Sequence, residues 1–257
     1  MSAAETGQVR LQVALARAGI ASRRAAAQAI VEGRVSVNGE IAREPGRRVD
    51  PSNDEIRIDD IPIDREPLRY YALHKPLGVL SAASDDRGRP TVTKFLPSDA
   101  GRCVPVGRLD LESEGLLLLT NDGPLINSLL HPSNRLPREY IVELRGRPSD
   151  NDLERVHTGV RLDDGVIARA NPKRLRRPSS TPGTSWLRLT LHQGRKREIR
   201  RICEAIGYPV VRLIRVRFGP IRLRDLGSGQ LRPLTDHEVR LLRARVPGPE
   251  PAQDTTV

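Results

Sequence analysis

Four consecutive leucines, Leu116–Leu119, constrain the fold of this 257-residue chain more than any other feature. A short, uninterrupted apolar run of this kind predicts a buried strand. Three acidic residues, Asp110, Glu112 and Glu114, crowd the turn-like segment Gly107–Gly115 directly before it. A buried strand does not need acids beside it. The chain must therefore fold around a buried strand whose approach carries carboxylates, and this loop is a candidate site of chemistry.

The rest of the chain from Tyr70 onward has a mixed pattern of strands and helices. The predicted strands are Tyr70–Leu73, Val104–Val106, Leu116–Thr120, Tyr140–Leu144, Val166–Ala170, Trp186–His192 and Val210–Phe218. The predicted helices are Pro124–Leu130, Asp150–His157, Arg195–Ile206 and Asp236–Arg243. Strands outnumber helices and do not alternate strictly with them, which favours an α+β fold over a doubly wound sheet. Residues 172–184, rich in proline and basic residues, are expected to form a surface loop.

The first fifty residues predict a compact unit of two short helices and a hairpin. Apolar residues recur at helical spacing over residues 11–18, and Gly19 suits the left-handed turn that ends a helix. Ser22 can cap a second helix that continues through Glu32. Asn38-Gly39 then lies between two strand-like segments and is a strong signal for a hairpin.

The chain is strongly basic, with 43 Lys and Arg residues against 32 Asp and Glu residues and a formal net charge of +11. Four of the basic residues are lysines, so 43 − 4 = 39 are arginines. Arginine stacks on bases and binds phosphate through a planar fork of donors. We therefore expect a polyanionic partner such as a nucleic acid. A GC-rich coding bias is an alternative explanation for the ratio of arginine to lysine.

Several classes of protein are disfavoured by absent motifs. The start of the chain lacks a signal-peptide pattern and no run approaches the ~18 apolar residues of a membrane span, so we expect a cytoplasmic protein without membrane contact. Cys103, Cys203 and the five histidines show no metal-ligand spacing. Neither GxGxxG nor GxxxxGK[ST] is present. We expect no metal and no cofactor, so that side chains alone carry the chemistry.

Asp110 is the acid of the loop best suited to chemistry. It lies between Leu109 and Leu111 and is expected to be partly withdrawn from water, whereas Glu112 and Glu114 are expected to face solvent. A carboxylate in a low-dielectric pocket is neutralised unless a cation holds it ionised. An ordinary loop acid is the alternative interpretation.

The segment GRKREIRR, Gly194–Arg201, supplies candidate cations at the start of a predicted helix. Arg195, Lys196 and Arg197 oppose the positive end of the helix dipole, a clash of about 0.3–1 kcal/mol each that a bound phosphate would relieve. Arg200 falls on the margin of the apolar stripe and could reach inward to a carboxylate. A basic face that is merely solvated is the alternative.

Tyr140 is a candidate for stacking on a nucleic-acid base, because the chain has few aromatic residues. Tyrosine in a strand more often packs in the core. Tyr70, Tyr71 and Trp186 compete for the stacking role, and the sequence does not rank them.

The segment LARAGIASRRAAAQAIVEGRVSVNGEIA resembles the S4 RNA-binding domain, in which two helices and a β-turn form a basic surface for structured RNA. The resemblance covers about residues 9–55. It implies that Arg23, Arg24 and Arg34 bind RNA. Surface arginines that only solvate a small domain are the alternative.

Four further segments resemble the RsuA-type ribosomal RNA pseudouridine synthases over about residues 69–245. They are HKPLGVLSA, GRLDLESEGLLLLTNDG, REYIVEL and GRKREIRRICEAIGYPVVRLIRVRFGPI. The resemblance implies an α+β catalytic domain with a mixed, mainly antiparallel sheet behind an S4 domain. We expect domains over residues 9–60 (S4) and 69–246 (catalytic). Composition predicts a linker at 61–68 and a disordered, Pro- and Gly-rich tail at 247–257.

The same resemblance implies roles for individual residues. Asp110 corresponds to the catalytic aspartate, Tyr140 to the tyrosine that stacks on the target base, and Arg200 to the basic partner of the aspartate. Arg108 matches the arginine that helps hold the flipped nucleotide. We add Lys75, Arg195, Lys196 and Arg197 to the expected RNA-binding residues.

The expected activity is therefore isomerisation of uridine to pseudouridine in ribosomal RNA, by a monomer that acts in ribosome biogenesis. The ending VVRLIRVRFGPIRL and the basic N-terminal half favour a large-subunit RNA target over a small-subunit one. Two other functions stay open at this point. One is a non-catalytic ribosome-assembly factor with an S4 domain, and the other is a glycosidase or nucleoside hydrolase that uses Asp110 with Glu112 or Glu114.

Overall fold

The computed structural model describes residues 8–244 except 52, 65 and 179–181. The chain divides into an N-terminal unit, up to Arg69 with Asn121–Gly123, and a C-terminal unit, Tyr70–Thr120 with the residues from Pro124 onward. The tail expected at 247–257 lies outside the described residues. The described helices are at most nine residues long, and none could cross a bilayer.

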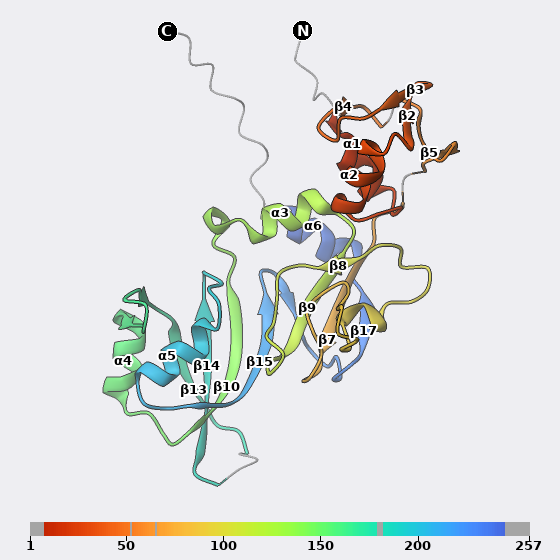
Figure 1. The fold of residues 1–257 in the computed structure, drawn as a ribbon. Helices are drawn as coiled ribbons and strands as arrows, with labels where there is room; N and C mark the ends of the chain where they lie inside the picture. The colour runs from red at the N-terminus through yellow and green to blue at the C-terminus, as the bar shows by residue number, and fades with distance from the viewer. Residues whose placement is uncertain (1–7, 52, 65, 179–181, 245–257) are drawn as a thin grey trace, which may run out of the picture. The chain divides into compact units, whose positions relative to one another are not determined.

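The N-terminal unit contains the two helices and the hairpin that the sequence predicts (Figure 1). Ser22 caps the second helix by accepting a hydrogen bond from Ala25 N at 3.1 Å. Asn38 and Gly39 both have positive φ, as a tight hairpin turn requires. The sheet order is β3-β2-β5-β6, and β1 pairs separately with β4. The elements are β1 (Val9–Arg10), α1 (Leu11–Arg17), α2 (Arg23–Val31), β2 (Val35–Val37), β3 (Glu40–Ala42), β4 (Arg48–Val49), β5 (Ile56–Ile58) and β6 (Ile61–Pro62).

The C-terminal unit is built on a nine-stranded sheet with the order β13-β14-β10-β15-β9-β7-β17, to which β16 and β8 are added beside β15 and β9. All strand pairs are antiparallel except β15 with β9. Its strands are β7 (Tyr70–Lys75), β8 (Val104–Pro105), β9 (Glu114–Thr120), β10 (Arg138–Arg145), β13 (Asn171–Leu175), β14 (Thr184–Leu191), β15 (Val210–Phe218), β16 (Ile221–Arg222) and β17 (Leu231–Pro233). The predicted α+β fold is confirmed.

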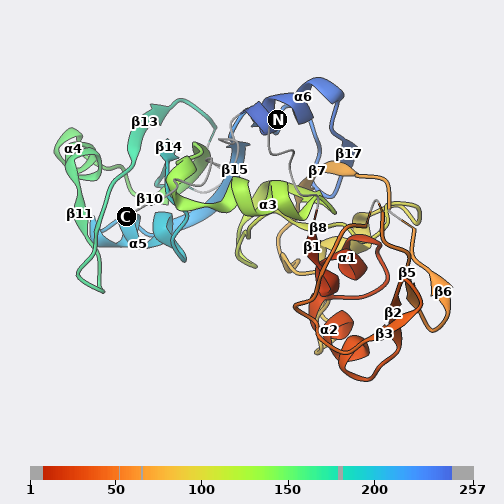
Figure 2. The same cartoon turned by 90° about the horizontal axis from the view of Figure 1, so that it is seen from above.

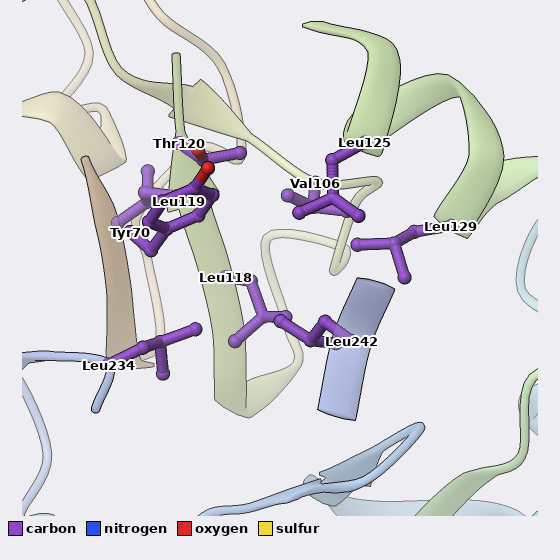
Figure 3. A pocket seen from close by; sticks show the side chains of 9 residues that line it. All are labelled: Tyr70, Val106, Leu118, Leu119, Thr120, Leu125, Leu129, Leu234 and Leu242. Atoms are coloured by element: carbon purple, nitrogen blue, oxygen red, sulfur yellow. The ribbon is translucent and has the colours of Figure 1, made fainter. Parts of the chain in front are cut away.

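Helices and a small hairpin flank this sheet. They are α3 (Gly123–Leu130), α4 (Asp150–Thr158), α5 (Glu198–Ala205), α6 (Asp236–Ala244), the 3₁₀ helices η1 (Val92–Phe95) and η2 (Pro132–Asn134), and the hairpin β11 (Val160–Arg161) and β12 (Ile167–Ala168). Figure 2 shows α4 beside β13, whereas α5 contacts β15 and β11. Leu125 and Leu129 of α3 and Leu242 of α6 point toward β9 around a small apolar pocket (Figure 3). This pocket belongs to the core that holds both helices on the sheet.

Three element predictions need correction. The expected loop over 172–184 contains most of strand β13, which lies at the sheet edge, where a proline and basic side chains are tolerated. The helix predicted from Arg195 begins at Glu198, because Arg197 adopts a left-handed conformation with φ of 52°. The strand predicted over Val166–Ala170 shortens to β12, which pairs with β11 rather than with the large sheet.

Candidate active site

Asp110 lies in the loop that enters β9. The segment turns sharply at this point, and Ser113 N donates a hydrogen bond to the main-chain oxygen of Asp110 at 3.0 Å. The Asp110 side chain is half-buried, while its neighbour Leu109 is buried in the core. The partial withdrawal from water that the sequence predicts is therefore found.

A second segment holds this loop on both sides of Asp110. Ser81 Oγ donates to Leu109 O at 2.8 Å and accepts from Leu109 N at 3.0 Å. Gly78 N donates to Leu111 O at 3.0 Å. Because the residues before and after Asp110 are both fixed, the loop has little freedom to move the carboxylate. Ser81 was not among the residues singled out from the sequence.

Strand β9 is joined to β15 by an unusually close contact at Gly115. Its φ is 108°, and a Cβ added there would lie 2.3 Å from Arg215 O and 2.6 Å from Arg215 N. Only glycine fits such an approach of two backbones. Gly115 pairs directly with Arg215 in the parallel β9–β15 ladder. The glycine therefore brings the start of β9 against β15.

Four strands meet in one cross-strand row at this level of the sheet. Tyr140 of β10 pairs with Arg215 of β15, Arg215 with Gly115 of β9, and Gly115 with Lys75 of β7. Side chains of directly paired residues lie on the same face of a sheet. Tyr140, Arg215 and Lys75 therefore face the same side, at the end of β9 where Asp110 enters.

Lys75, counted among the expected RNA-binding residues, is fully buried. Its Nζ donates to Pro76 O at 2.9 Å and to Val79 O at 2.8 Å, and so organises the turn that leads to Gly78 and Ser81. Burial lowers the pKa of Lys75 to about 8, although the nearby charges of Asp110 and Glu114 act to raise it. Lys75 is thus an internal cation whose charge acts on Asp110.

The structure does not show the expected ion pair between Asp110 and Arg200. Among the described residues, no cation lies within 4.0 Å of the Asp110 carboxylate. Arg200 reaches inward from α5, as predicted, and is 7% exposed. Its Nη2 donates to the main-chain oxygen of Glu112 at 2.8 Å. Arg200 therefore binds the loop at Glu112, two residues beyond Asp110. Its guanidinium contacts the main-chain oxygen of Glu112 and not the Asp110 carboxylate.

Glu114 was expected to face solvent and is instead buried, with 4% of its surface exposed. Arg212 binds it through two hydrogen bonds, from Nε at 2.6 Å and Nη2 at 3.0 Å. A carboxylate that accepts both arms of a guanidinium tolerates burial. Because Glu114 is engaged in this way, it is a poor partner for Asp110 in a two-carboxylate hydrolysis.

Tyr140 lies on the same face of the sheet as Arg215 and Lys75. Its side chain is half-buried and packs against the apolar cluster that contains Leu109. Tyr71 and Trp186 are buried, at 7% and 5% exposure, and Arg243 covers Tyr70 at 5.8 Å from its ring centroid. Tyr140 therefore stays our predicted stacking residue.

The sequence interpretation missed two further cations beside Tyr140, namely Arg138 and Arg215. Both lie near the ring of Phe218, at 5.2 and 5.3 Å from its centroid. Arg215 is 2% exposed, and its Nε donates to Leu116 O at 2.7 Å. The sequence did offer a signal for the burial of Arg215. Residues i and i+2 of a strand share a face, so Arg215 lies on the same face as the apolar Leu213.

The other predicted RNA-binding residues lie at the surface. Arg195, Lys196 and Arg197 are exposed just before α5, and Arg108 is exposed just before Leu109. In the N-terminal unit, Arg23 and Arg24 are exposed at the start of α2. Arg34 is also exposed but binds Asp59 through both arms of its guanidinium. In the part of the chain that the structure describes, no three His, Cys, Asp or Glu residues are grouped to hold a metal ion.

Comparison with known proteins identifies the family of this chain. Residues 69–205, which include Asp110, Tyr140 and Arg200, match the RNA pseudouridylate synthase family, and residues 9–56 match the S4 domain. The chain is 44% identical to ribosomal large subunit pseudouridine synthase B of Bacillus subtilis (strain 168) over 235 residues, 91% of this chain and 96% of that protein. It is 41% identical to the protein of the same name from Pseudomonas aeruginosa over 244 residues, 92% of this chain and 62% of that protein.

A solved structure is similar over nearly the same span. The crystal structure of a pseudouridylate synthase matches with a TM-score of 0.65 and 29% identity, over 91% of this chain and 99% of that one. This chain belongs to the RNA pseudouridylate synthase family and is an RNA pseudouridine synthase with an S4 domain.

Proposed function

We propose that this enzyme isomerises uridine in large-subunit ribosomal RNA, with Asp110 as the catalytic residue. The observation that carries the proposal is the cross-strand row, which sets Tyr140, Arg215 and Lys75 on the face where the loop of Asp110 enters. The large-subunit target is supported by the names of the two relatives compared above. The S4 domain supports structured RNA as the substrate class.

The reaction sets clear requirements for the site. The N1–C1′ bond of the uridine breaks, the uracil rotates, and a C5–C1′ bond forms while the C5 proton leaves and N1 gains a proton. The target base must first leave the RNA stack. No oxidation or reduction occurs, and the reaction needs no redox or phosphate cofactor.

Each residue then has a role in the proposal. Asp110 attacks the ribose or the ring as a nucleophile, or acts as a base. Tyr140 stacks on the everted uracil, and the exposed Arg108 steadies the displaced backbone. Arg200 holds the loop through Glu112 O and supplies positive charge beside the carboxylate. The surrounding cations Lys75, Arg138 and Arg215 keep the site favourable for an anion.

The experiment compares Asp110→Asn with the parent enzyme on large-subunit ribosomal RNA that carries tritium at C5 of uridine. We expect Asp110→Asn to bind the RNA as the parent does and to release no tritium above background. Asp86→Asn, an exposed acid of the same unit, is the matched control and should release tritium at the parent rate. Tritium release by Asp110→Asn at the parent rate would refute the assignment.

The proposal also covers which ribosomal RNA is modified and the oligomeric state of the enzyme. Mapping pseudouridine in both ribosomal RNAs of a deletion strain distinguishes a large-subunit from a small-subunit target. We further propose that the enzyme acts in the cytoplasm as a monomer. Sedimentation of the purified enzyme as a species larger than 28.5 kDa would contradict the monomer.

A further inference from the structure

An exposed carboxylate lies on two arginines beside the catalytic loop. Glu112 Oε2 is 3.3 Å from Nη1 of Arg197 and 3.9 Å from Nε of Arg200. The Glu112 side chain is 63% exposed, whereas that of Arg200 is 8% exposed. We name these three side chains the Glu112 anion site. In this site the exposed carboxylate of Glu112 lies on the solvent side of the buried Arg200 guanidinium.

Arg200 is incompletely satisfied by this carboxylate. Its Nη2 is bound to Glu112 O, but its Nε is buried and has no hydrogen-bond partner among the described residues. A separation of 3.9 Å is too long for a hydrogen bond. A buried charged donor without an acceptor is unfavourable. The Glu112 anion site therefore favours an anion that reaches closer to Nε than Glu112 does.

The acidic side chains near the Glu112 anion site bind other partners. Arg201 binds Asp163 and Asp164, and Glu198 accepts a hydrogen bond from Arg195 N at 3.1 Å. Within the described part of the chain, Glu112 is the acid that lies within 4.0 Å of Arg197 or Arg200. Two guanidiniums thus share a single carboxylate, and the site carries an excess of positive charge.

We propose that the Glu112 carboxylate is a placeholder for a backbone phosphate of the substrate RNA, and that RNA binding displaces it from Arg197 and Arg200. The inference rests on the proposed function, because it takes RNA as the ligand of this site. A phosphate offers more acceptor oxygens than one carboxylate and matches the arginine fork. An exposed ion pair contributes little to stability, so the exchange of one anion for another is easy.

The location indicates which phosphate binds. Glu112 follows Asp110 by two residues, so their α-carbons are at most about 7 Å apart. The turn between them is closed by the hydrogen bond from Ser113 N to Asp110 O. The phosphate in the Glu112 anion site therefore belongs to the target uridine or to a nucleotide directly beside it.

The test measures RNA affinity after the placeholder charge is removed. Glu112→Gln keeps the size of the side chain, and we expect it to bind transcribed large-subunit ribosomal RNA about three- to tenfold more tightly than the parent at a fixed, moderate salt concentration. Glu204→Gln is the matched control, because Glu204 is an exposed acid of α5 and the charge change is the same. We expect less than a twofold gain for the control. An equal gain in both variants would overturn the proposal.

A second comparison asks whether the gain depends on the arginine. In an Arg197→Gln background, Glu112→Gln should improve affinity by less than twofold, because the phosphate has lost one of its two guanidiniums. A gain that persists in this background would overturn the proposal. Matched thermal melting of all variants establishes that they fold, and Glu112→Ala replaces Glu112→Gln if the latter does not fold.

Tritium release by the parent on the same RNA separates the two proposals. If the parent releases tritium and Glu112→Gln binds no more tightly than the parent, the placeholder fails while the proposed function stands. If the parent releases no tritium from ribosomal RNA, the proposed function fails.

Discussion

At the scale of single residues, the buried ammonium of Lys75 makes the stability of the fold depend on pH. Its side chain has no exposed surface, and its donors bind the main-chain oxygens of Pro76 and Val79. A neutral amine also donates hydrogen bonds, so these two contacts persist when the proton is lost. The unfavourable free energy of burying Lys75 therefore comes from its charge, and loss of the proton removes it without breaking either hydrogen bond.

The pH dependence of stability follows from this cost. Folded Lys75 loses its proton at a pKa of about 8, whereas the ordinary value is 10.5. Between these values unfolding takes up a proton, so the contribution of Lys75 to the free energy of unfolding rises with pH, by up to about 3 kcal/mol. Below pH 8 both states keep the proton and the cost is fully present.

Urea unfolding at pH 7 and at pH 10 checks this expectation. The difference in unfolding free energy between the parent and Lys75→Met should shift in favour of the parent at pH 10. For Lys94→Met, an exposed lysine, the difference should be the same at both values. Parallel dependence for the two variants would contradict the assignment of a charged, buried Lys75.

Lys75 also shows what a sequence conceals at this scale. A lysine is normally exposed, and nothing in the HKP motif marks this one as buried. Asp110, Tyr140 and Arg200 were recognisable because each lies in a specific motif. The burial of Glu114 and Arg215 was not predictable, because it depends on partners about 100 residues away in the chain.

At the scale of elements, the pairing of β9 with β15 determines the geometry of the site. It is the one parallel pair in the described part of the large sheet, and it connects only Ile214 with Glu114 and Arg215 with Gly115. So short a ladder depends on the close backbone contact at Gly115.

We therefore expect Gly115→Ala to be strongly destabilising, by about 2–5 kcal/mol, because it combines a strained φ with a backbone clash. Gly88→Ala is the control. Gly88 also has a positive φ, of 70°, but a Cβ there meets nothing within 4 Å. It should cost only about 1–2 kcal/mol. Chemical unfolding measures both, and equal losses would show that the β9–β15 contact contributes nothing beyond backbone strain.

Elements with local signals were predictable, and those defined by distant partners were not. The cap at Ser22, the hairpin at Asn38 and the apolar run of β9 each depend on residues close in sequence. Strand β13 has the composition of a loop and becomes a strand only because β14 offers it an edge. The predicted start of α5 at Arg195 was wrong because nothing in the sequence GRKRE indicates that Arg197 adopts a left-handed conformation.

At the scale of the whole molecule, the N-terminal unit has a core of its own. The buried apolar residues of the N-terminal unit form a cluster that contains no residue of the catalytic sheet. The cation pair at the start of α2, Arg23 and Arg24, is exposed and available to phosphate. The N-terminal unit is therefore expected to supply affinity, and the C-terminal unit chemistry.

The salt dependence of RNA binding tests this division in the full-length chain. Each lost phosphate contact lowers the slope of log affinity against log salt by about 1. We expect Arg23→Gln with Arg24→Gln to lower the slope by about 1–2 and to leave kcat at saturating RNA unchanged. Arg34→Gln should change the slope less, because Asp59 already binds that guanidinium. A reduced kcat with an unchanged slope would contradict the division.

The cross-strand row also has a consequence for biosynthesis. Lys75 and Arg215 contribute to the same site, although 215 − 75 = 140 residues separate them. At about 5–20 residues per second, a translating ribosome adds those residues in about 7–28 s. During the later part of that interval, once residue 110 has been added, the nascent chain holds Asp110 but lacks β15, the strand that carries Arg215. Catalytic competence therefore arises only after β15 has been synthesised.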